Sequence, residues 1–408
     1  MLRLRDAAGG LLPKLWPAAE DRVECGAAEM NAKPAVAPGT RTGFAGGPVP
    51  SGMPSNQEIE WALRRAWFPI ARVEDLGQPR RVELLGEVLV VFLTEDGRPS
   101  ICANRCPHRG AALSDGTVDG ECIVCPYHGW AWRGDGSCLQ VPSLDANAPI
   151  PPRAVVASHH AALRWGLVWC ALDEPVVALP APPALDGVEW EHGAGGPIAV
   201  AAGLRAATEN FRDVAHFPFV HRKTMGELPR VVEPLEVKRD GIEVHLSRTY
   251  EAAGGEEKIW HAGMRFDYHA IAPGFVCLTM KGGDGGTRVL LNAPSPRTSP
   301  VSPASDGRHR TTIFWVEGFI KGFTAMTLDE LLASEAKVYE EDNPILDRIE
   351  PSEAPLDRAA QVHTLADKYT LAYRQAFVEF VRRANSTEKE NVPDHRGVAD
   401  SREPHSVF

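Results

Sequence analysis

The sequence predicts an α+β protein in which a small all-β domain precedes a domain with an antiparallel sheet and helices. Three observations predict this class. Short β-type runs separated by turns fill residues 82–173, further β-type segments follow from residue 190, and two amphipathic helical segments occupy 327–342 and 365–384. Strands and helices that are segregated along a chain in this way are typical of α+β folds.

The composition fits such a two-domain protein. The 408 residues are 44% hydrophobic, enough to bury a core. A formal net charge of −11 argues against a general affinity for nucleic acid. No apolar run reaches the length that a bilayer crossing needs, and the N-terminal apolar residues are broken by Gly9, Gly10 and Pro13. Since cysteines cluster between Cys102 and Cys138 without an export signal, we expect metal binding in a cytoplasmic protein, not disulfides.

Four regions follow one another along the chain. Residues 1–56 are rich in Ala, Gly and Pro and lack periodicity, which predicts a disordered arm. Residues 57–175 form the small all-β domain, and a Pro-rich linker begins at 175. The second domain is predicted over 176–385, and the polar tail 386–408 is predicted to be disordered.

Individual segments support each domain. In the first, residues 59–71 predict a short helix and an entry strand, and 81–93 and 163–172 predict strand pairs. In the second, 208–217 predicts a helix before the main sheet. The strand-like segments of that sheet are 235–250, 266–280, 287–294 and 311–320.

Two ligand sets compete in the stretch from Cys106 to Trp130. Cys102, Cys106, Cys122 and Cys125 have the character of a zinc ribbon. The second set is Cys106, His108, Cys125 and His128, with sixteen residues between the two halves. Here each half supplies one Cys and one His, which is the ligand demand of a Rieske [2Fe–2S] cluster.

The flanking residues favour the mixed set. Pro follows each cysteine, and Gly110 and Gly129 lie just beyond the two histidines. Glycine lets backbone amides approach the cluster sulfurs. A zinc ribbon has no need of two matched histidines. Cys102 and Cys122 are then expected to be ordinary core or strand cysteines.

CPHRGA (106–111) and CPYHGW (125–130) resemble the paired cluster motifs of the Rieske non-haem iron oxygenases. The resemblance extends over about 60–385 and is greatest to single-polypeptide monooxygenases of the vanillate O-demethylase, methylxanthine N-demethylase and toluenesulfonate methyl-monooxygenase type. It implies a helix-grip, START-like second domain. The cluster motif alone would also fit a Rieske ferredoxin.

A second metal site is predicted in TENFRDVAHFPFVH (208–221). His216 and His221 need a carboxylate to complete the 2-His-1-carboxylate triad of an Fe(II) oxygenase. Asp342 is preferred because Pro344, two residues on, should kink the helix at the ligand. Glu340, Glu341 and Asp347 are assigned to a solvated acidic face.

Two further residues receive roles. Asp213 and His216 are spaced i, i+3 and are expected on one helix face, with Pro218 breaking that helix. Asp213 is therefore a natural acceptor for His216. The resemblance implies that Asp213 links the iron-bound histidine to a cluster histidine of a neighbouring subunit, and that Asn210 lines the site.

The resemblance implies a terminal oxygenase that uses O2, a [2Fe–2S] cluster and a mononuclear Fe(II). No dinucleotide-binding loop follows a strand, so a separate NAD(P)H-dependent flavin and iron–sulfur reductase or a ferredoxin is expected. The expected reaction is hydroxylation or O- or N-demethylation of an aromatic or other small apolar substrate in a homotrimer. Ring dihydroxylation and a non-catalytic electron carrier remain the alternatives.

Overall fold

The computed structural model describes residues 52–391, apart from 146, 186, 251–263, 283–285 and 321–325. The predicted disordered arm 1–56 and tail 386–408 therefore lie largely outside the described residues. Ser55 caps the N-terminus of the first helix, α1 (Asn56–Arg64). Its hydroxyl accepts a bond from the Glu58 amide, and the Glu58 carboxylate accepts one from the Ser55 amide in return.

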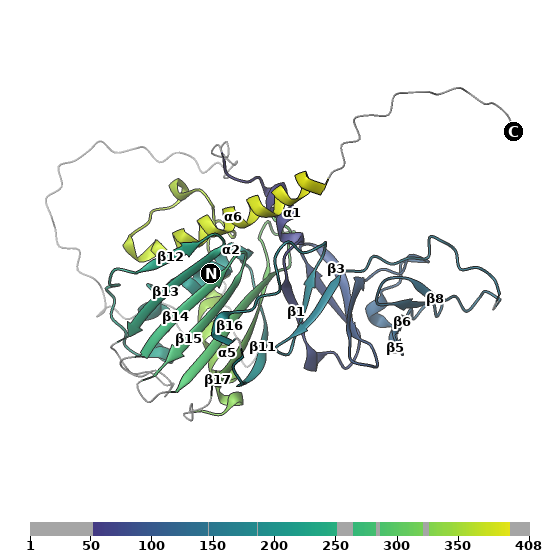
Figure 1. Cartoon of the computed structure of the whole chain (residues 1–408), viewed down its shortest axis with the longest axis horizontal. Coiled ribbons are helices and arrows are strands. Elements are labelled where there is room, and N and C mark those ends of the chain that lie inside the picture. The colour runs from purple at the N-terminus through teal and green to yellow at the C-terminus, as the bar shows by residue number, and fades with distance from the viewer. Residues whose placement is uncertain are drawn as a thin grey trace, which may run out of the picture. The chain divides into compact units, whose positions relative to one another are not determined.

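The first half of the chain is built from three small antiparallel sheets (Figure 1). Short hairpins join neighbouring strands within each sheet, as the turn-rich sequence predicts, but the first sheet also pairs two strands that are far apart in the sequence. The first sheet contains β1 (Phe68–Arg72), β10 (Leu167–Ala171) and β9 (His160–Arg164), in that order. The second contains β2 (Arg80–Leu84), β3 (Glu87–Leu93) and β4 (Pro99–Ala103); the third contains β5 (Thr117–Asp119), β6 (Cys122–Val124), β7 (Ala131–Arg133) and β8 (Cys138–Gln140).

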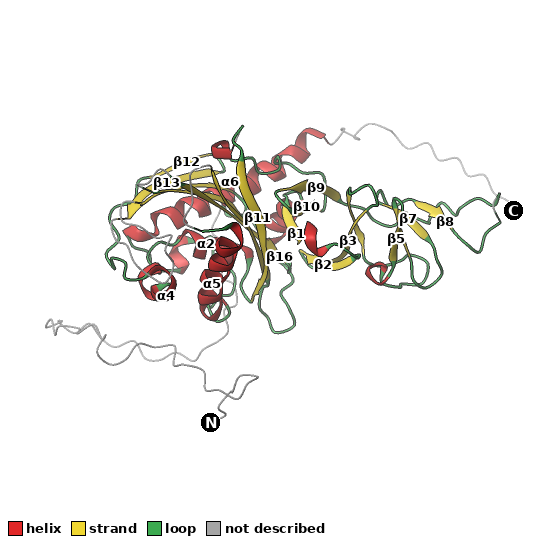
Figure 2. Ribbon diagram, turned by 90° about the horizontal axis from the view of Figure 1, so that it is seen from below, coloured by secondary structure: helices red, strands yellow, loops and turns green. Residues whose placement is uncertain are grey.

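The second half is one seven-stranded antiparallel sheet with helices on one face (Figure 2). Its strand order is β11-β17-β16-β15-β14-β13-β12. The strands are β11 (Trp190–Val200), β12 (Val237–Asp240), β13 (Glu243–Tyr250), β14 (Met264–Ile271), β15 (Phe275–Lys281), β16 (Thr287–Pro296) and β17 (Thr311–Ile320). The helices are α2 (Leu204–Arg212), α3 (Phe217–Val220), α4 (Arg222–Met225), α5 (Leu328–Leu346) and α6 (Lys368–Asn391).

Alternation along the strands decides which side chains face the helices. In β14, Phe266, Tyr268 and Ala270 are buried, whereas the intervening Asp267 and His269 are only partly buried. The buried set joins the core that α5 and α6 complete. The inner face of the sheet and the helices therefore enclose the space in which a ligand could lie.

The two halves share contacts at several points. The amides of Leu85 and Gly86 donate to the carbonyls of Pro296 (2.8 Å) and Arg297 (2.7 Å). Helix α1 packs against α6, and Arg65 donates to the Ala384 carbonyl at 3.0 Å. The segment that opens the predicted first domain thus packs on the last helix of the second.

The C-terminal ends of three helices differ from their predicted limits. Helix α2 ends at Arg212, because Asp213 leaves the helical region with φ −80° and ψ 110°. Helix α5 continues through Pro344 to Leu346. Helix α6 continues to Asn391, beyond the predicted start of the tail at 386. The α+β class itself is confirmed. Within the described part of the chain, no helix has both the length and the apolar character that a bilayer crossing needs.

Candidate metal centres

Two loops in the first half of the chain repeat the same hydrogen-bond pattern. In the first, the Cys106 amide donates to the Ala111 carbonyl and the Gly110 amide donates to the Cys106 carbonyl, both at 2.9 Å. Residues 125–130 repeat both bonds at 2.9 and 3.0 Å. Each loop therefore presents one cysteine and, two or three residues later, one histidine in equivalent turns.

The glycines make these turns possible. Gly110 has φ +78° and Gly129 has φ +72°. Residues with a side chain rarely adopt this left-handed backbone conformation, whereas glycine adopts it without a steric penalty. The Gly residues that follow the two histidines in the sequence are thus explained by the backbone of the loops.

The sulfur and imidazole groups point to different environments. Cys106 and Cys125 are buried, at 2% and 3% exposure, and burial raises the pKa of the Cys106 thiol. The rings of His108 and His128 are 4.4 Å apart, and His128 is exposed. Trp130 stacks on His108 at 4.5 Å. The thiols thus face the core and the histidines lie towards the surface.

The four residues fit a Rieske cluster. The His108 Nδ1 atom is buried and has no hydrogen-bond partner, as expected for a nitrogen that serves as a metal ligand. Cys102, from the zinc alternative, directs its thiol to the Gly134 carbonyl at 3.8 Å. Among the described residues, no three cysteine sulfurs lie within 4.8 Å of one another, so a single zinc ion held by these cysteines has no ready site.

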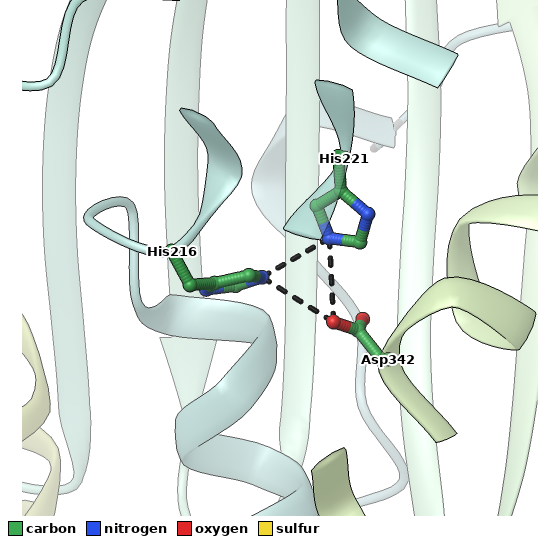
Figure 3. A group of neighbouring side chains, drawn as sticks. All are labelled: His216, His221 and Asp342. Carbon is green, nitrogen blue, oxygen red and sulfur yellow. Dashed lines mark hydrogen bonds and ion pairs between the residues drawn. The ribbon is translucent and has the colours of Figure 1, made fainter. Parts of the chain in front are cut away.

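A second group of ligand atoms lies in the other half, where three segments meet (Figure 3). His216 lies in the loop after α2, and His221 lies between α3 and α4. Asp342 lies on the buried face of α5. The helix predicted over 208–217 was wrong beyond Arg212, and Pro218 starts the short α3 instead of breaking a longer helix.

The three side chains converge on one point. Asp342 Oδ1 lies 3.5 Å from His216 Nε2 and 3.3 Å from His221 Nε2. The two Nε2 atoms are 3.1 Å apart. Among the described residues this is one of two groups with suitable donor atoms within 4.8 Å. Two imidazole nitrogens and one carboxylate that face the same position are the donors that Fe(II) oxygenases use.

Burial and the neighbouring side chains act in opposite directions on the protonation of this group. Burial favours the neutral Asp342 carboxyl, but the two imidazoles outweigh this and lower its pKa to about 2. Burial lowers the pKa of His216, yet the carboxylates of Asp213 and Asp342 raise it to about 9. At neutral pH the carboxylate is therefore ionised and His216 holds a proton, which a bound metal would displace.

Further groups hold the converging side chains in place. Glu341 Oε2 lies 3.0 Å from His221 Nδ1 and accepts a bond from the Thr224 hydroxyl at 2.7 Å. The assignment of Glu341 to a solvated face was therefore wrong. Asp347 also has a specific contact, since it accepts a bond from the Ala201 amide at 2.7 Å.

The two residues predicted to support the site both lie beside it. Asn210 donates from Nδ2 to Asp342 Oδ1 at 3.2 Å. Asp213 Oδ2 lies 3.6 Å from His216 Nδ1, although the two residues do not share a helix. Asp213 also accepts a bond from the Ala215 amide at 2.8 Å, which fixes the turn that carries His216.

The other convergent group differs in character. Glu243, His245 and His269 lie on β13 and β14, and His269 Nε2 is 2.8 Å from Glu243 Oε2. The His245 and Glu243 side chains are about half exposed, at 47% and 45%. This group is therefore more exposed than the His216 group.

A cavity adjoins His221 and Asp342. Most of its wall is apolar or aromatic, including Phe211, Phe266 and Leu278. The site thus places metal-type donors beside a mainly apolar cavity.

Comparisons with known proteins agree with both sites. Residues 66–159 match the Rieske [2Fe–2S] domain, and residues 200–383 match the vanillate O-demethylase oxygenase C-terminal domain. The chain therefore belongs to the Rieske non-haem iron oxygenases, as the sequence motifs indicate. It is 31% identical over 336 residues to methylxanthine N1-demethylase NdmA of Pseudomonas putida, covering 78% of this chain and 89% of the relative.

Solved structures show the same architecture. NdmA of Pseudomonas putida CBB5 with caffeine matches with a TM-score of 0.66 and 27% identity, over 80% of this chain and 96% of that one. Dicamba monooxygenase bound to dicamba matches with a TM-score of 0.61 at 18% identity, over 81% and 99% of the two chains, which shows the fold alone.

Family membership establishes the general chemistry. The chain is an oxidoreductase, the oxygenase component of a Rieske system, and not only an electron carrier. It uses a Rieske [2Fe–2S] cluster, a mononuclear iron and O2. Both groups of side chains fit these cofactors by their donor chemistry.

Proposed function

We propose that the chain is a terminal monooxygenase that hydroxylates or demethylates an aromatic or other small apolar substrate. Cys106, His108, Cys125 and His128 would hold the [2Fe–2S] cluster, and His216, His221 and Asp342 would hold the iron. When bound, these centres supply electrons and O2 activation. The convergence of the three iron-site donors beside an apolar cavity supports this proposal most directly.

The chain's own residues have three tasks in this proposal. The apolar wall binds the substrate and keeps water from the reacting carbon. Glu341 accepts a hydrogen bond from the Nδ1–H group of His221, which leaves Nε2 free to bind metal. Asn210 holds the Asp342 carboxylate in one orientation through its amide.

Demethylation is favoured over ring dihydroxylation by similarity alone. The relative with 31% identity is named as an N-demethylase, and the C-terminal match is to an O-demethylase domain. Oxidation of a methyl carbon that is attached to N or O gives an unstable product that loses formaldehyde. Dihydroxylation would use the same ligands, so product analysis must separate the two outcomes.

The proposed system has an external electron donor and a symmetric assembly. A separate NAD(P)H-dependent reductase or a ferredoxin would supply electrons to the cluster. A head-to-tail homotrimer would bring the cluster of one subunit to the iron of the next, with Asp213 between them. The cytoplasmic location inferred from cysteine usage stays a prediction.

The experiment replaces one proposed iron ligand. His216→Ala should abolish substrate oxidation, with a surrogate reductase and a panel of methoxy, N-methyl and aryl-methyl compounds, while the cluster's visible absorption is kept. His245→Ala, in the exposed histidine group, is the matched control and should remain active. Oxidation that survives His216→Ala would contradict the proposal.

A further inference from the structure

The cavity beside the proposed iron site has two different ends. His221 and Asp342 line one end. Among the residues that line the remainder, Arg288 and Glu335 are the charged ones, and aromatic and aliphatic side chains make most of the wall between. We call the pair Arg288 and Glu335, with the Glu317 carboxylate behind them, the polar pole.

Helix α5 sets the distance between these ends. Glu335, Tyr339 and Asp342 are all buried on the face that α5 turns to the cavity. Glu335 and Asp342 are seven residues apart, so their backbones are separated by about 10 Å along the helix axis. A single-ring molecule with groups at opposite ends can therefore approach both.

The Arg288 guanidinium of the polar pole already has two carboxyl partners. Arg288 Nη2 donates to Glu335 Oε2 at 3.0 Å and also contacts the Glu317 carboxylate. The side chains of Arg288, Glu335 and Glu317 are 2%, 6% and 0% exposed, respectively. One guanidinium thus faces two carboxyl groups, and no other arginine and no lysine is among the described residues that line the cavity. Glu317 Oε2 is buried without a hydrogen-bond partner.

The electrostatic balance has consequences for a ligand. The Arg288 guanidinium is already bound to Glu335 and Glu317. A ligand carboxylate would be desolvated beside the Glu335 carboxyl, while the Arg288 guanidinium is already bound to two carboxyl groups, which is costly. A ligand N–H or ammonium group would instead find an acceptor.

We propose that the polar pole selects substrates whose non-reacting end carries a hydrogen-bond donor, such as an N–H, O–H or ammonium group, and rejects carboxylates. Glu335 is the specificity-determining residue because it lines the cavity, whereas Glu317 lies behind Arg288. This inference rests on the proposed function for the identity of the cavity as the substrate site.

A binding experiment tests it without turnover. Isothermal titration calorimetry of the anaerobic holoenzyme compares 4-methoxybenzylamine, 4-methoxybenzyl alcohol and 4-methoxybenzoate, which share the ring and the methyl ether. The amine and the alcohol should each bind at least about tenfold more tightly than the benzoate. Equal binding of the three, or binding of none, would overturn the inference.

Two variants separate a specific contact from a structural role. Glu335→Gln should lower the affinity ratio of amine to alcohol by about tenfold, because the carboxylate charge is lost while the shape is kept. Glu340→Gln removes the same charge from the exposed face of α5 and should leave the ratio unchanged. An unchanged ratio in Glu335→Gln would contradict the assignment; the three wild-type affinities test the inference even if this variant fails to fold.

The outcome is distinguishable from failure of the proposed function. Product formation is measured separately, with reductase and O2 added. Binding in the predicted order without any product would support the polar pole as a binding determinant and contradict the proposed reaction. Product formed from the benzoate with the highest kcat/KM of the three would overturn the selectivity.

Discussion

At the scale of single residues, the side chains that support the candidate iron site explain its geometry. Glu341 and Thr224 fix the orientation of His221, and Asn210 fixes that of Asp342. Such supporting contacts determine how well a preformed site retains its metal. The acidic run at 340–342 therefore divides into an exposed residue, a supporting residue and a candidate ligand.

Replacing Glu341 by Gln tests this division. The variant loses the charged acceptor for the Nδ1 proton of His221, so we expect the affinity for Fe(II) to fall by about 10- to 100-fold. Competition with a chelator measures the affinity. Glu340→Gln is the control, because Glu340 is exposed on the same helix and should retain normal affinity. Equal losses in both variants would refute a specific role for Glu341.

Glu317 makes the stability depend on pH. Its ordinary pKa of 4.5 is raised to about 8 by burial, so the folded chain holds this proton more tightly than the unfolded chain. Between these two values the folded state binds more protons, and stability therefore falls as the pH rises. In Glu317→Gln this fall between about pH 5 and pH 8 should be smaller, as measured by urea unfolding. A steeper fall in the variant would show that the sign is wrong.

At the scale of elements, the two cluster loops are equivalent in hydrogen bonding but not in surroundings. A Cβ atom on Gly129 would lie 3.2 Å from Pro142 Cγ, which belongs to a rigid ring. A Cβ atom on Gly110 would lie 3.4 Å from the flexible Arg105 side chain. Both glycines have the left-handed backbone conformation, but only Gly129 is packed against a rigid neighbour.

Alanine at each glycine separates these effects. Either substitution places a side chain in the left-handed region, at a cost of roughly 1–2 kcal/mol. Gly129→Ala should be the more destabilising because it adds the contact with Pro142. Loss of visible absorption on heating measures how well each variant retains its cluster. A less stable Gly110→Ala would indicate that Pro142 moves away easily.

The elements also show what the sequence could and could not predict. The Cys106–His108 and Cys125–His128 loops were predictable because ligands and glycines lie within a few residues of one another. The role of Glu341 was not, because the face that α5 buries depends on its packing against β11 and β17. The end of α2 at Arg212 was missed since Asp213 turns the chain within a helix-like run. Arg288 contacts Glu317 and Glu335, which follow it by 29 and 47 positions in the sequence, and no local sequence pattern reveals such contacts.

At the scale of the whole molecule, the described halves share a continuous core, with α1 packed on α6. Family membership and the α+β class were predictable from motifs and periodicity and are confirmed. The substrate, the electron donor and the assembly were not, because they depend on surfaces and cavities formed by distant segments.

Asp213 tests the proposed assembly. If it links the two centres across a subunit boundary, Asp213→Asn should lower turnover by about tenfold or more while both metal centres remain loaded. Rapid mixing of the reduced protein with O2 and substrate, with absorbance of the cluster as the signal, measures cluster oxidation directly. Sedimentation analysis should give a trimer for both proteins. Unchanged cluster oxidation in a trimeric variant would exclude this role.

The central claim is that a mixed thiolate–imidazole cluster and a separate mononuclear iron occupy the two sites. Iron and acid-labile sulfide analysis of the holoprotein and Asp342→Ala, with EPR after dithionite reduction, tests it most directly. We predict about three irons and two sulfides per wild-type chain, and about one iron fewer in the variant with the Rieske EPR signal unchanged. Stoichiometric zinc, no Rieske signal, or full iron content in Asp342→Ala would contradict the account.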